Sequence, residues 1–285
     1  MTTPDPRPAG RLEGWVLAML YVLASGAWMF FLLFLSTIAL AVVIGPFDDS
    51  TAARMDEAIW NPWLLGPFTF LQMVGFGVLV AVFVRIGRRS WDRAAPWVIR
   101  GWRPLVAAAA AGLAIGGPTS MFAEQLDGLS WLSNDSLQGV GQALTQGDLL
   151  PRLMLMAAVT ILAPIVEELM FRGLLWDALS DHLPPAGVFA LTSVAFAAYH
   201  FDPLHSLAVF PVGLLLGWLR WRTGGIVAPM LAHFANNAVA LGSLLVLGPE
   251  AEASVAWAIG GTLVVLAALG ALVLLGPPED PAASP

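Results

Sequence analysis

Residues 150–179 read LPRLMLMAAVTILAPIVEELMFRGLLWDAL, a run long enough to span a bilayer as a helix, which needs about 20 apolar residues. The interior of this run nevertheless contains Glu167, Glu168 and Arg172. Ionisable side chains at bilayer depth are costly, so each requires a partner and usually marks a function. The stretch therefore predicts a membrane-spanning helix whose polar residues face other parts of the protein.

The composition of the whole chain agrees with a membrane location. Of the 285 residues, 58% are hydrophobic and 12% are charged, whereas about a quarter of the residues of a soluble domain are charged. Further apolar runs follow the same pattern, and we expect about eight transmembrane helices in an all-α polytopic membrane protein. With 150–179, the runs are 15–44, 64–84, 104–122, 187–200, 204–221, 225–247 and 255–276.

The domain organisation follows from these runs. The first apolar run is too long for the core of a cleaved signal peptide, so it predicts an uncleaved first helix. Residues 14–276 are expected to form a single transmembrane domain. The polar, proline-containing ends, 1–13 and 277–285, are expected to be disordered tails.

The distribution of arginine predicts the orientation, because short loops rich in basic residues stay in the cytoplasm. The loop between the second and third runs is the most basic part of the chain, whereas Arg54 is the only arginine in the loops expected outside. Both termini are therefore expected in the cytoplasm. Basic residues that are all arginine, with abundant Ala, Gly, Pro and Trp, indicate a GC-rich bacterial genome, so we expect the membrane to be a bacterial plasma membrane. The basic loop contains Arg85, Arg88, Arg89, Arg93, Arg100 and Arg103.

The two glutamates of the fourth run differ in helical phase. On an α-helix turning about 100° per residue, Glu168 and Arg172 lie on nearly the same face, four positions apart. Glu167 points about 140° away from Arg172. The sequence predicts an ion pair between Glu168 and Arg172 and a Glu167 carboxylate that is free to face a cavity.

Two later runs carry polar side chains at the same spacing. The fifth run ends with Phe196 and His200, four positions apart, and the seventh places His233 and Asn237 four apart. Residues four apart lie on one face of a helix. Three helices therefore offer polar faces inside the membrane.

These polar residues lie at similar depths. At a rise of ~1.5 Å per residue, Glu167, His200 and His233 lie about 15 to 20 Å from the cytoplasmic ends of their runs. The run 187–200 is too short to cross the bilayer, so we expect it to form a hairpin with 204–221 whose tip carries His200. Irregular backbone at that depth is tolerated where it lines a cavity.

Three motifs occur in order, each in its own apolar run. They are EExxxR at Glu167, Glu168 and Arg172, FxxxH at Phe196 and His200, and HxxxN at His233 and Asn237. In these motifs the chain resembles the CAAX-protease and bacteriocin-processing (CPBP) membrane peptidases, which include the type II CAAX prenyl endopeptidase. The resemblance covers residues 164–237, about a quarter of the chain.

The resemblance implies an intramembrane endopeptidase with its active site within the bilayer and a catalytic core at about 150–247. Glu167 would activate water with help from His200, and His233 with Asn237 would stabilise the oxyanion. Glu168, Arg172 and Phe196 would support the site structurally. The substrate would be a membrane-associated peptide or protein.

A metal is the main open question of mechanism. Glu167, His200 and His233 would supply the three protein ligands of a catalytic zinc site. Ligation would however occupy Glu167 and leave Glu168, already held by Arg172, as the base. Zinc hydrolases with a glutamate base keep that carboxylate free of the metal, so we expect a mechanism without a cofactor.

Other interpretations compete with this one. His200 could cap a hairpin, and His233 with Asn237 could be interhelical hydrogen-bonding residues. A non-catalytic membrane scaffold or a transporter-like protein could use the same cluster to bind a ligand. His182 and His205 are interpreted as loop or hairpin residues outside the site.

Several function classes are excluded. The chain has no cysteine, which rules out a cysteine nucleophile and thiolate metal sites. It has no GxSxG, HExxH or Walker A motif. A net charge of −7 without a basic stripe argues against nucleic acid as a partner.

Overall fold

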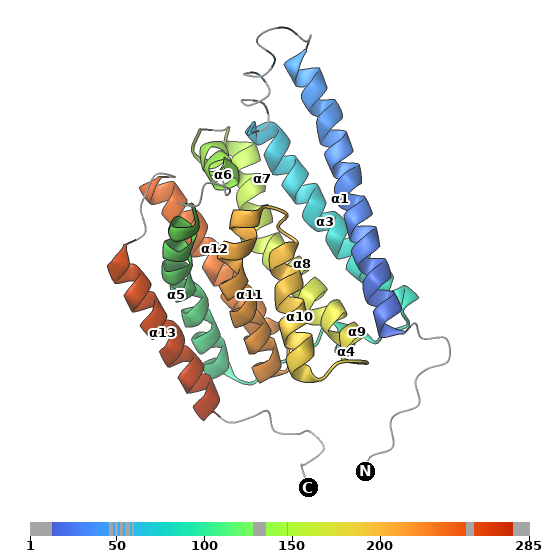
Figure 1. Cartoon of the computed structure of the whole chain (residues 1–285), viewed down its shortest axis with the longest axis vertical. Helices are drawn as coiled ribbons and strands as arrows, with labels where there is room; N and C mark the ends of the chain where they lie inside the picture. Colours follow the sequence, from blue (N-terminus) through green and yellow to red (C-terminus); the bar gives the residue numbers. More distant parts are fainter. Residues whose placement is uncertain are drawn as a thin grey trace.

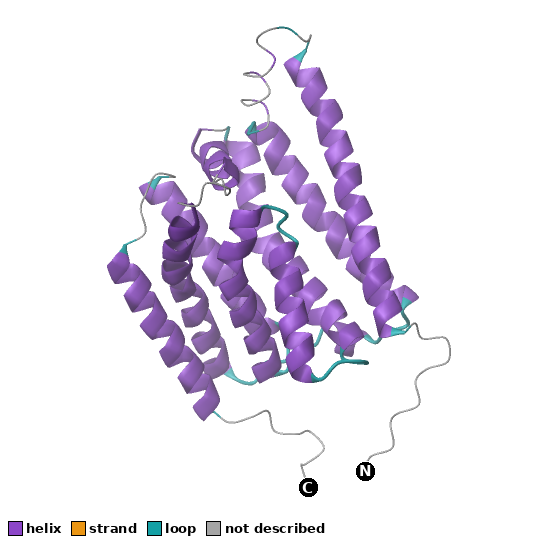
Figure 2. Ribbon diagram, in the orientation of Figure 1, coloured by secondary structure: helices purple, strands orange, loops and turns teal. Residues whose placement is uncertain are grey.

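The computed structural model describes residues 13–45, 60–127, 135–146, 148–248 and 254–275, together with Asp48, Thr51, Arg54 and Ala58. Every regular element in this part of the chain is helical, and the helices pack into one bundle (Figures 1 and 2). The all-α prediction is confirmed. The two predicted tails fall almost entirely outside the described residues.

Seven described helical stretches are long and apolar enough to cross a membrane, and an eighth, Pro185–Ala198, is shorter. All eight predicted runs are thus present, including the short one. Figure 1 shows that the start of α1 and the end of α13 lie at the same end of the bundle. The long helices are α1 (Gly14–Ile44), α3 (Pro62–Ile86), α5 (Trp102–Asp127), α11 (Pro203–Thr223), α12 (Val227–Leu247) and α13 (Val255–Leu274).

The fourth run is broken into five consecutive elements. The prediction of one regular α-helix is wrong here, because two of the five have the wider π-helical backbone. The chain nevertheless continues through all of them as one membrane helix from Leu149 to Leu179. The elements are α7 (Leu149–Ala157), η1 (Ala158–Leu162), α8 (Ala163–Glu167), η2 (Glu168–Leu175) and α9 (Trp176–Leu179).

The fifth run forms α10 (Pro185–Ala198), which packs antiparallel to α11 as the predicted hairpin. At ~1.5 Å per residue, α10 is about 21 Å long, shorter than the ~30 Å core of a bilayer. Two short helices, α4 (Trp91–Ala94) and α6 (Asp135–Gln146), were not predicted.

Close contacts between helix backbones position the helix that carries His233. A Cβ atom added to Gly112 of α5 would lie 2.1 Å from the carbonyl oxygen of Ala232 on α12, so only glycine allows this approach. A Cβ atom added to Gly261 of α13 would likewise lie 2.4 Å from the carbonyl oxygen of Ala114 on α5. Small residues that let backbones approach are typical of helix packing in membranes.

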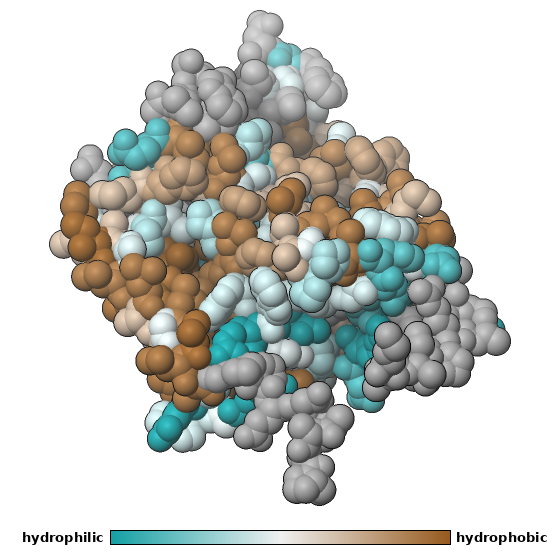
Figure 3. All heavy atoms as spheres, turned by 60° about the horizontal axis from the view of Figure 1, so that its bottom comes forward, coloured by the Kyte–Doolittle hydropathy of each residue, from teal (hydrophilic) through white to brown (hydrophobic). Residues whose placement is uncertain are grey.

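The end of the bundle with the arginine-rich loop is polar. Arg89 is buried there, with Nη1 2.7 Å from Asp177 Oδ2 and Nη2 2.6 Å from Asp181 Oδ2. Hydrophilic residues gather around this end of the molecule beside apolar surface (Figure 3). This distribution agrees with a boundary between a membrane-facing belt and an aqueous face.

Candidate active site

Glu167 lies between two π-helical segments of the same membrane helix. Pro164 has no N–H to donate to the carbonyl of Thr160, and its ring would collide with that carbonyl in a regular α-helix. The backbone before it widens into η1, and η2 begins directly after Glu167. Single π-helical turns inside α-helices occur frequently at functional sites.

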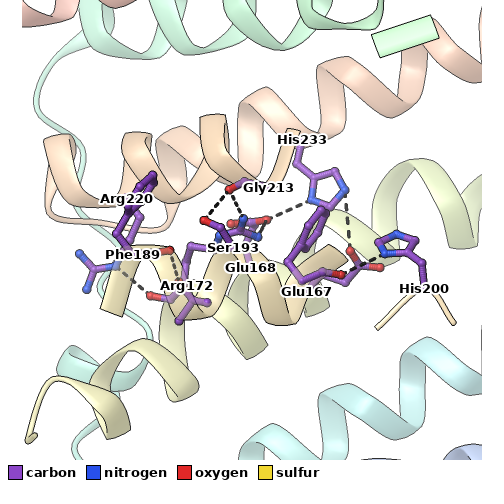
Figure 4. A network of polar contacts seen from close by, with 11 residues as sticks. Glu167, Glu168, Arg172, Phe189, Ser193, His200, Gly213, Arg220 and His233 are labelled. Atoms are coloured by element: carbon purple, nitrogen blue, oxygen red, sulfur yellow. Dashed lines mark hydrogen bonds and ion pairs between the residues drawn. The ribbon is translucent and has the colours of Figure 1, made fainter. Parts of the chain in front are cut away.

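The expected ion pair between Glu168 and Arg172 is present and fully buried. Arg172 Nη1 lies 3.0 Å from Glu168 Oε1, and both side chains have no exposed surface. Arg172 also donates from Nη2 to the carbonyl of Gly213, 2.8 Å away, and its own carbonyl accepts from Arg220. Ser193 donates to the same Gly213 carbonyl (Figure 4). The pair therefore joins η2 to α10 and α11.

The sequence reasoning missed Ser193, Gly213 and Arg220. A signal was available, since Gly213 and Gly217 form a GxxxG motif, which is typical of close helix packing in membranes. A Cβ atom on Gly213 would lie 3.0 Å from Phe196 Cδ1, and one on Gly217 would lie 2.7 Å from Ser193 Oγ. These glycines let α10 approach α11 closely enough for Ser193 to reach the Gly213 carbonyl.

Phe196 lies at the centre of the cluster and is buried. The Arg172 guanidinium carbon is 4.6 Å from the centre of its ring, a cation–π contact. The rings of Phe171, His200 and His233 lie 5.5, 5.3 and 5.6 Å from it, all in edge-to-face geometry. Phe196 thus holds the two histidines and the arginine in fixed relative positions.

His233 is buried and lies between the two glutamates. Its Nδ1 atom is 3.1 Å from Glu168 Oε1, and its Nε2 atom is 3.9 Å from Glu167 Oε2. The sequence paired Glu168 with Arg172 alone, and that prediction was incomplete. Glu168 Oε1 contacts both Arg172 and His233.

Glu167 keeps one carboxylate oxygen free of hydrogen bonds. Its side chain is 15% exposed, and Oε2 has no hydrogen-bond partner among the residues that the structure describes. Figure 4 shows its side chain extending toward the side of the cluster where the rings of His200 and His233 lie. A carboxylate oxygen that accepts no hydrogen bond is able to accept a proton.

His200 lies past the end of α10, in the turn before α11. Its Nδ1 atom is 3.0 Å from the carbonyl of Phe196. Because a carbonyl only accepts, Nδ1 carries the proton and Nε2 is the free position of the neutral ring. The ring of His205, placed outside the site from the sequence, lies 4.7 Å from that of His200. The intervening Phe201 has a left-handed backbone, with φ 55°.

Asn237 is held in one orientation by two hydrogen bonds. Its Nδ2 donates to the carbonyl of Val159, 2.9 Å away, and its Oδ1 accepts from Asn236 Nδ2 at 3.2 Å. An amide nitrogen has two protons, so one remains for another acceptor. The sequence reasoning did not single out Asn236.

The residues considered for zinc do not form a three-ligand group as they lie. His233 Nδ1 contacts Glu168 and His200 Nδ1 contacts the Phe196 carbonyl, which leaves only the Nε2 atom of each ring as a possible ligand. Within the described ranges, no group of three or more His, Asp or Glu side chains is arranged to hold a metal ion. No catalytic step is therefore assigned to a metal.

Comparison with known proteins places this site in a recognised family region. Residues 149–239 match the family model described as type II CAAX prenyl endopeptidase Rce1-like. The chain is 32% identical over 78 residues to a Bacillus subtilis protein named "Putative membrane peptidase YdiL", covering 27% of this chain. It is 36% identical over 88 residues to an uncharacterized 24.3 kDa protein of Escherichia coli, covering 29% of this chain.

These matches are partial for the relatives as well, covering 32% and 41% of their lengths. No solved structure matches the chain. All three motifs fall inside the matched region, from Glu167 to Asn237. The resemblance predicted from the sequence is confirmed: through residues 149–239, this chain resembles the type II CAAX prenyl endopeptidase Rce1-like family.

Proposed function

We propose that this protein is an intramembrane endopeptidase that hydrolyses a peptide bond of a membrane-associated substrate with a water molecule activated by Glu167. The observation that carries the proposal is the contrast between the two adjacent glutamates. Glu168 is fully buried and its Oε1 contacts both Arg172 and His233, whereas Glu167 is 15% exposed and its Oε2 lies 3.9 Å from His233 Nε2. Oε2 of each glutamate has no hydrogen-bond partner among the described residues. The family match and the name of a relative support a peptidase.

In the first step, Glu167 takes a proton from the water, whose oxygen attacks the carbonyl carbon of the scissile bond. His200 assists by accepting a hydrogen bond from the same water at its free Nε2. The carbonyl oxygen becomes an oxyanion, which accepts hydrogen bonds from His233 Nε2 and from the second N–H of Asn237 Nδ2. Fixed donors in a low-dielectric site stabilise such an oxyanion strongly.

In the second step, Glu167 returns its proton to the amide nitrogen, the C–N bond breaks and a carboxylic acid and an amine are released. The charges of the cluster favour this cycle. The two carboxylates lie beside the Arg172 guanidinium and the His233 ring, which in this proposal donates from Nδ1 to Glu168 and from Nε2 to the oxyanion. Buried charges are tolerated when they are paired and hydrogen-bonded. The proton that Glu167 takes up is balanced by the oxyanion that forms.

The test uses the full-length protein in detergent or nanodiscs with a library of tagged membrane peptides, and detects new termini by mass spectrometry. Wild-type protein should cleave a subset of the library, and Glu167→Gln should cleave none. Glu124→Gln, a carboxylate change on the exposed face of α5, is the matched control and should retain activity. Binding of peptides without cleavage by the wild type would instead support a scaffold.

A further inference from the structure

We propose that Glu168 is a positioning residue that orients the ring of His233, in addition to being the counterion of Arg172. The inference rests on the proposed function, because an oriented His233 matters only if its Nε2 atom serves the reaction. The proposal assigns Glu168 a role in the chemistry. Its position four residues before Arg172 and its ion pair with Arg172 explain only a structural role.

The geometry of one oxygen atom carries the proposal. Glu168 Oε1 lies 3.0 Å from Arg172 Nη1 and 3.1 Å from His233 Nδ1. A carboxylate accepts hydrogen bonds, so Nδ1 of His233 donates and must carry a proton. The opposite ring nitrogen, Nε2, is thereby directed at the side of Glu167, whose Oε2 is 3.9 Å away (Figure 4). Which ring nitrogen is used in chemistry depends on the bond that the other one makes.

Glu168 is itself held firmly enough to orient a ring. Arg172 is fixed by the carbonyl of Gly213 and by the ring of Phe196. Phe196 also packs edge-on against His233, 5.6 Å between ring centres. The carboxylate and the imidazole are therefore held from both sides, and the Glu168 side chain has no exposed surface.

A simpler reading makes Glu168 only the counterion of Arg172. The two readings differ when both charges are removed together. If Glu168 serves only Arg172, the double variant Glu168→Leu, Arg172→Met loses an ion pair but no function, because no uncompensated charge remains. If Glu168 orients His233, the double variant recovers stability but not turnover.

The experiment compares wild type, Glu168→Leu, Arg172→Met and the double variant in the same detergent. Glu168→Leu, which has no oxygen to accept from His233, should lose both thermal stability and turnover. The double variant should regain most of the stability while its kcat stays up to about 10,000-fold below wild type, the loss caused by removing the carboxylate partner of a catalytic histidine. KM should change little. A double variant with wild-type stability and near-wild-type kcat would overturn the proposal.

A second readout needs no activity. The chain has four histidines, so ¹⁵N-histidine labelling gives a simple spectrum, in which the His233 signals are those missing from His233→Gln. Wild type should show a hydrogen-bonded, slowly exchanging Nδ1 proton that disappears in the double variant. Persistence of that proton in the double variant would refute the contact. The wild type could also cleave no peptide while the double variant loses this proton. That result would support the contact between Glu168 and His233 and contradict the proposed peptidase function.

Discussion

Asn237 donates from Nδ2 to the main-chain carbonyl of Val159, 2.9 Å away, inside the π-helical segment η1. The bond joins α12 to the helix that carries Glu167, about two helical turns before that residue. It also fixes which way the amide faces, because Oδ1 is held by Asn236. The widened backbone of η1, just before Pro164, thus helps to orient the amide of a neighbouring helix.

Replacing Asn237 with alanine removes the amide proton proposed to face the oxyanion. We expect kcat to fall by about 100- to 1,000-fold, the usual effect of losing one oxyanion-hole donor. Steady-state kinetics on a cleaved library peptide measure the effect. Asn236→Ala removes only the hydrogen bond that orients Asn237 and should cause a smaller loss. Wild-type kcat in Asn237→Ala would show that this residue has no part in the reaction.

The two glutamates should respond differently to the same change. Glu167→Gln should abolish cleavage and leave the thermal unfolding midpoint unchanged, because its Oε2 accepts no hydrogen bond in the described structure. Glu168→Gln should lower the free energy of unfolding by roughly 3 to 5 kcal/mol, because Arg172 stays buried without its counterion. Unfolding is followed in detergent beside the activity assay. Near-wild-type turnover of Glu167→Gln on a verified substrate would disprove the base assignment.

Sequence reasoning recovered the parts of the fold that depend on local pattern. Hydropathy located every membrane helix of the described residues, because a spanning helix must be apolar along its whole length. Helical phase gave the Glu168–Arg172 pair because residues four apart meet on a helix. The π-helical segments were missed because apolar side chains surround them. The spacing of polar and apolar residues along the sequence therefore does not change where the backbone widens.

Contacts between distant segments were the least predictable part of the site. The Glu168–His233 and Asn237–Val159 contacts join residues 65 and 78 positions apart. They depend on how closely the helices approach, which small residues such as Gly112 permit. The sequence does not give the axial position and rotation of one helix relative to another. It could therefore predict that the polar faces lie together, but not which atoms are in contact.

The close approach of α10 and α11 can be tested at Gly213. An added Cβ would lie 3.0 Å from Phe196 Cδ1 and 3.1 Å from the Ser193 carbonyl, so Phe196 or the helices must shift. We expect Gly213→Ala to cost about 1 to 3 kcal/mol of stability, as overpacked sites do, and to reduce turnover by displacing Phe196. Gly260→Ala on α13, with nothing within 4 Å of the new atom, is the control. Equal stability and activity of the two variants would contradict this packing role.

The orientation in the membrane can be tested with single cysteines in this cysteine-free chain. Ser90 and Ser254 are both exposed and lie at opposite ends of the bundle. Because the arginine-rich loop is expected in the cytoplasm, Ser90→Cys should react with an impermeant maleimide only in inverted vesicles. Ser254→Cys should react only in intact cells. Labelling of Ser90→Cys from outside the cell would reverse the proposed topology.

Metal dependence is the prediction that separates the two chemistries compatible with these residues. A catalytic zinc takes three protein ligands at about 2.0 to 2.2 Å. His233 Nε2 and Glu167 Oε2, 3.9 Å apart, are near the spacing of two such ligands, but the described residues supply no third beside them. Ligation would also occupy Glu167, and Glu168 already accepts from both Arg172 and His233.

We therefore expect active, purified protein to contain far less than one zinc per chain and to keep its turnover after exhaustive chelation. Elemental analysis and activity are measured on the same preparation, with Glu167→Gln as the inactive reference, so that metal content and turnover can be compared directly. The opposite result is equally clear. Stoichiometric zinc, with activity lost on chelation and restored by adding zinc, would turn Glu167 from a base into a ligand. The peptidase proposal would stand, but the activation of water would pass to the metal.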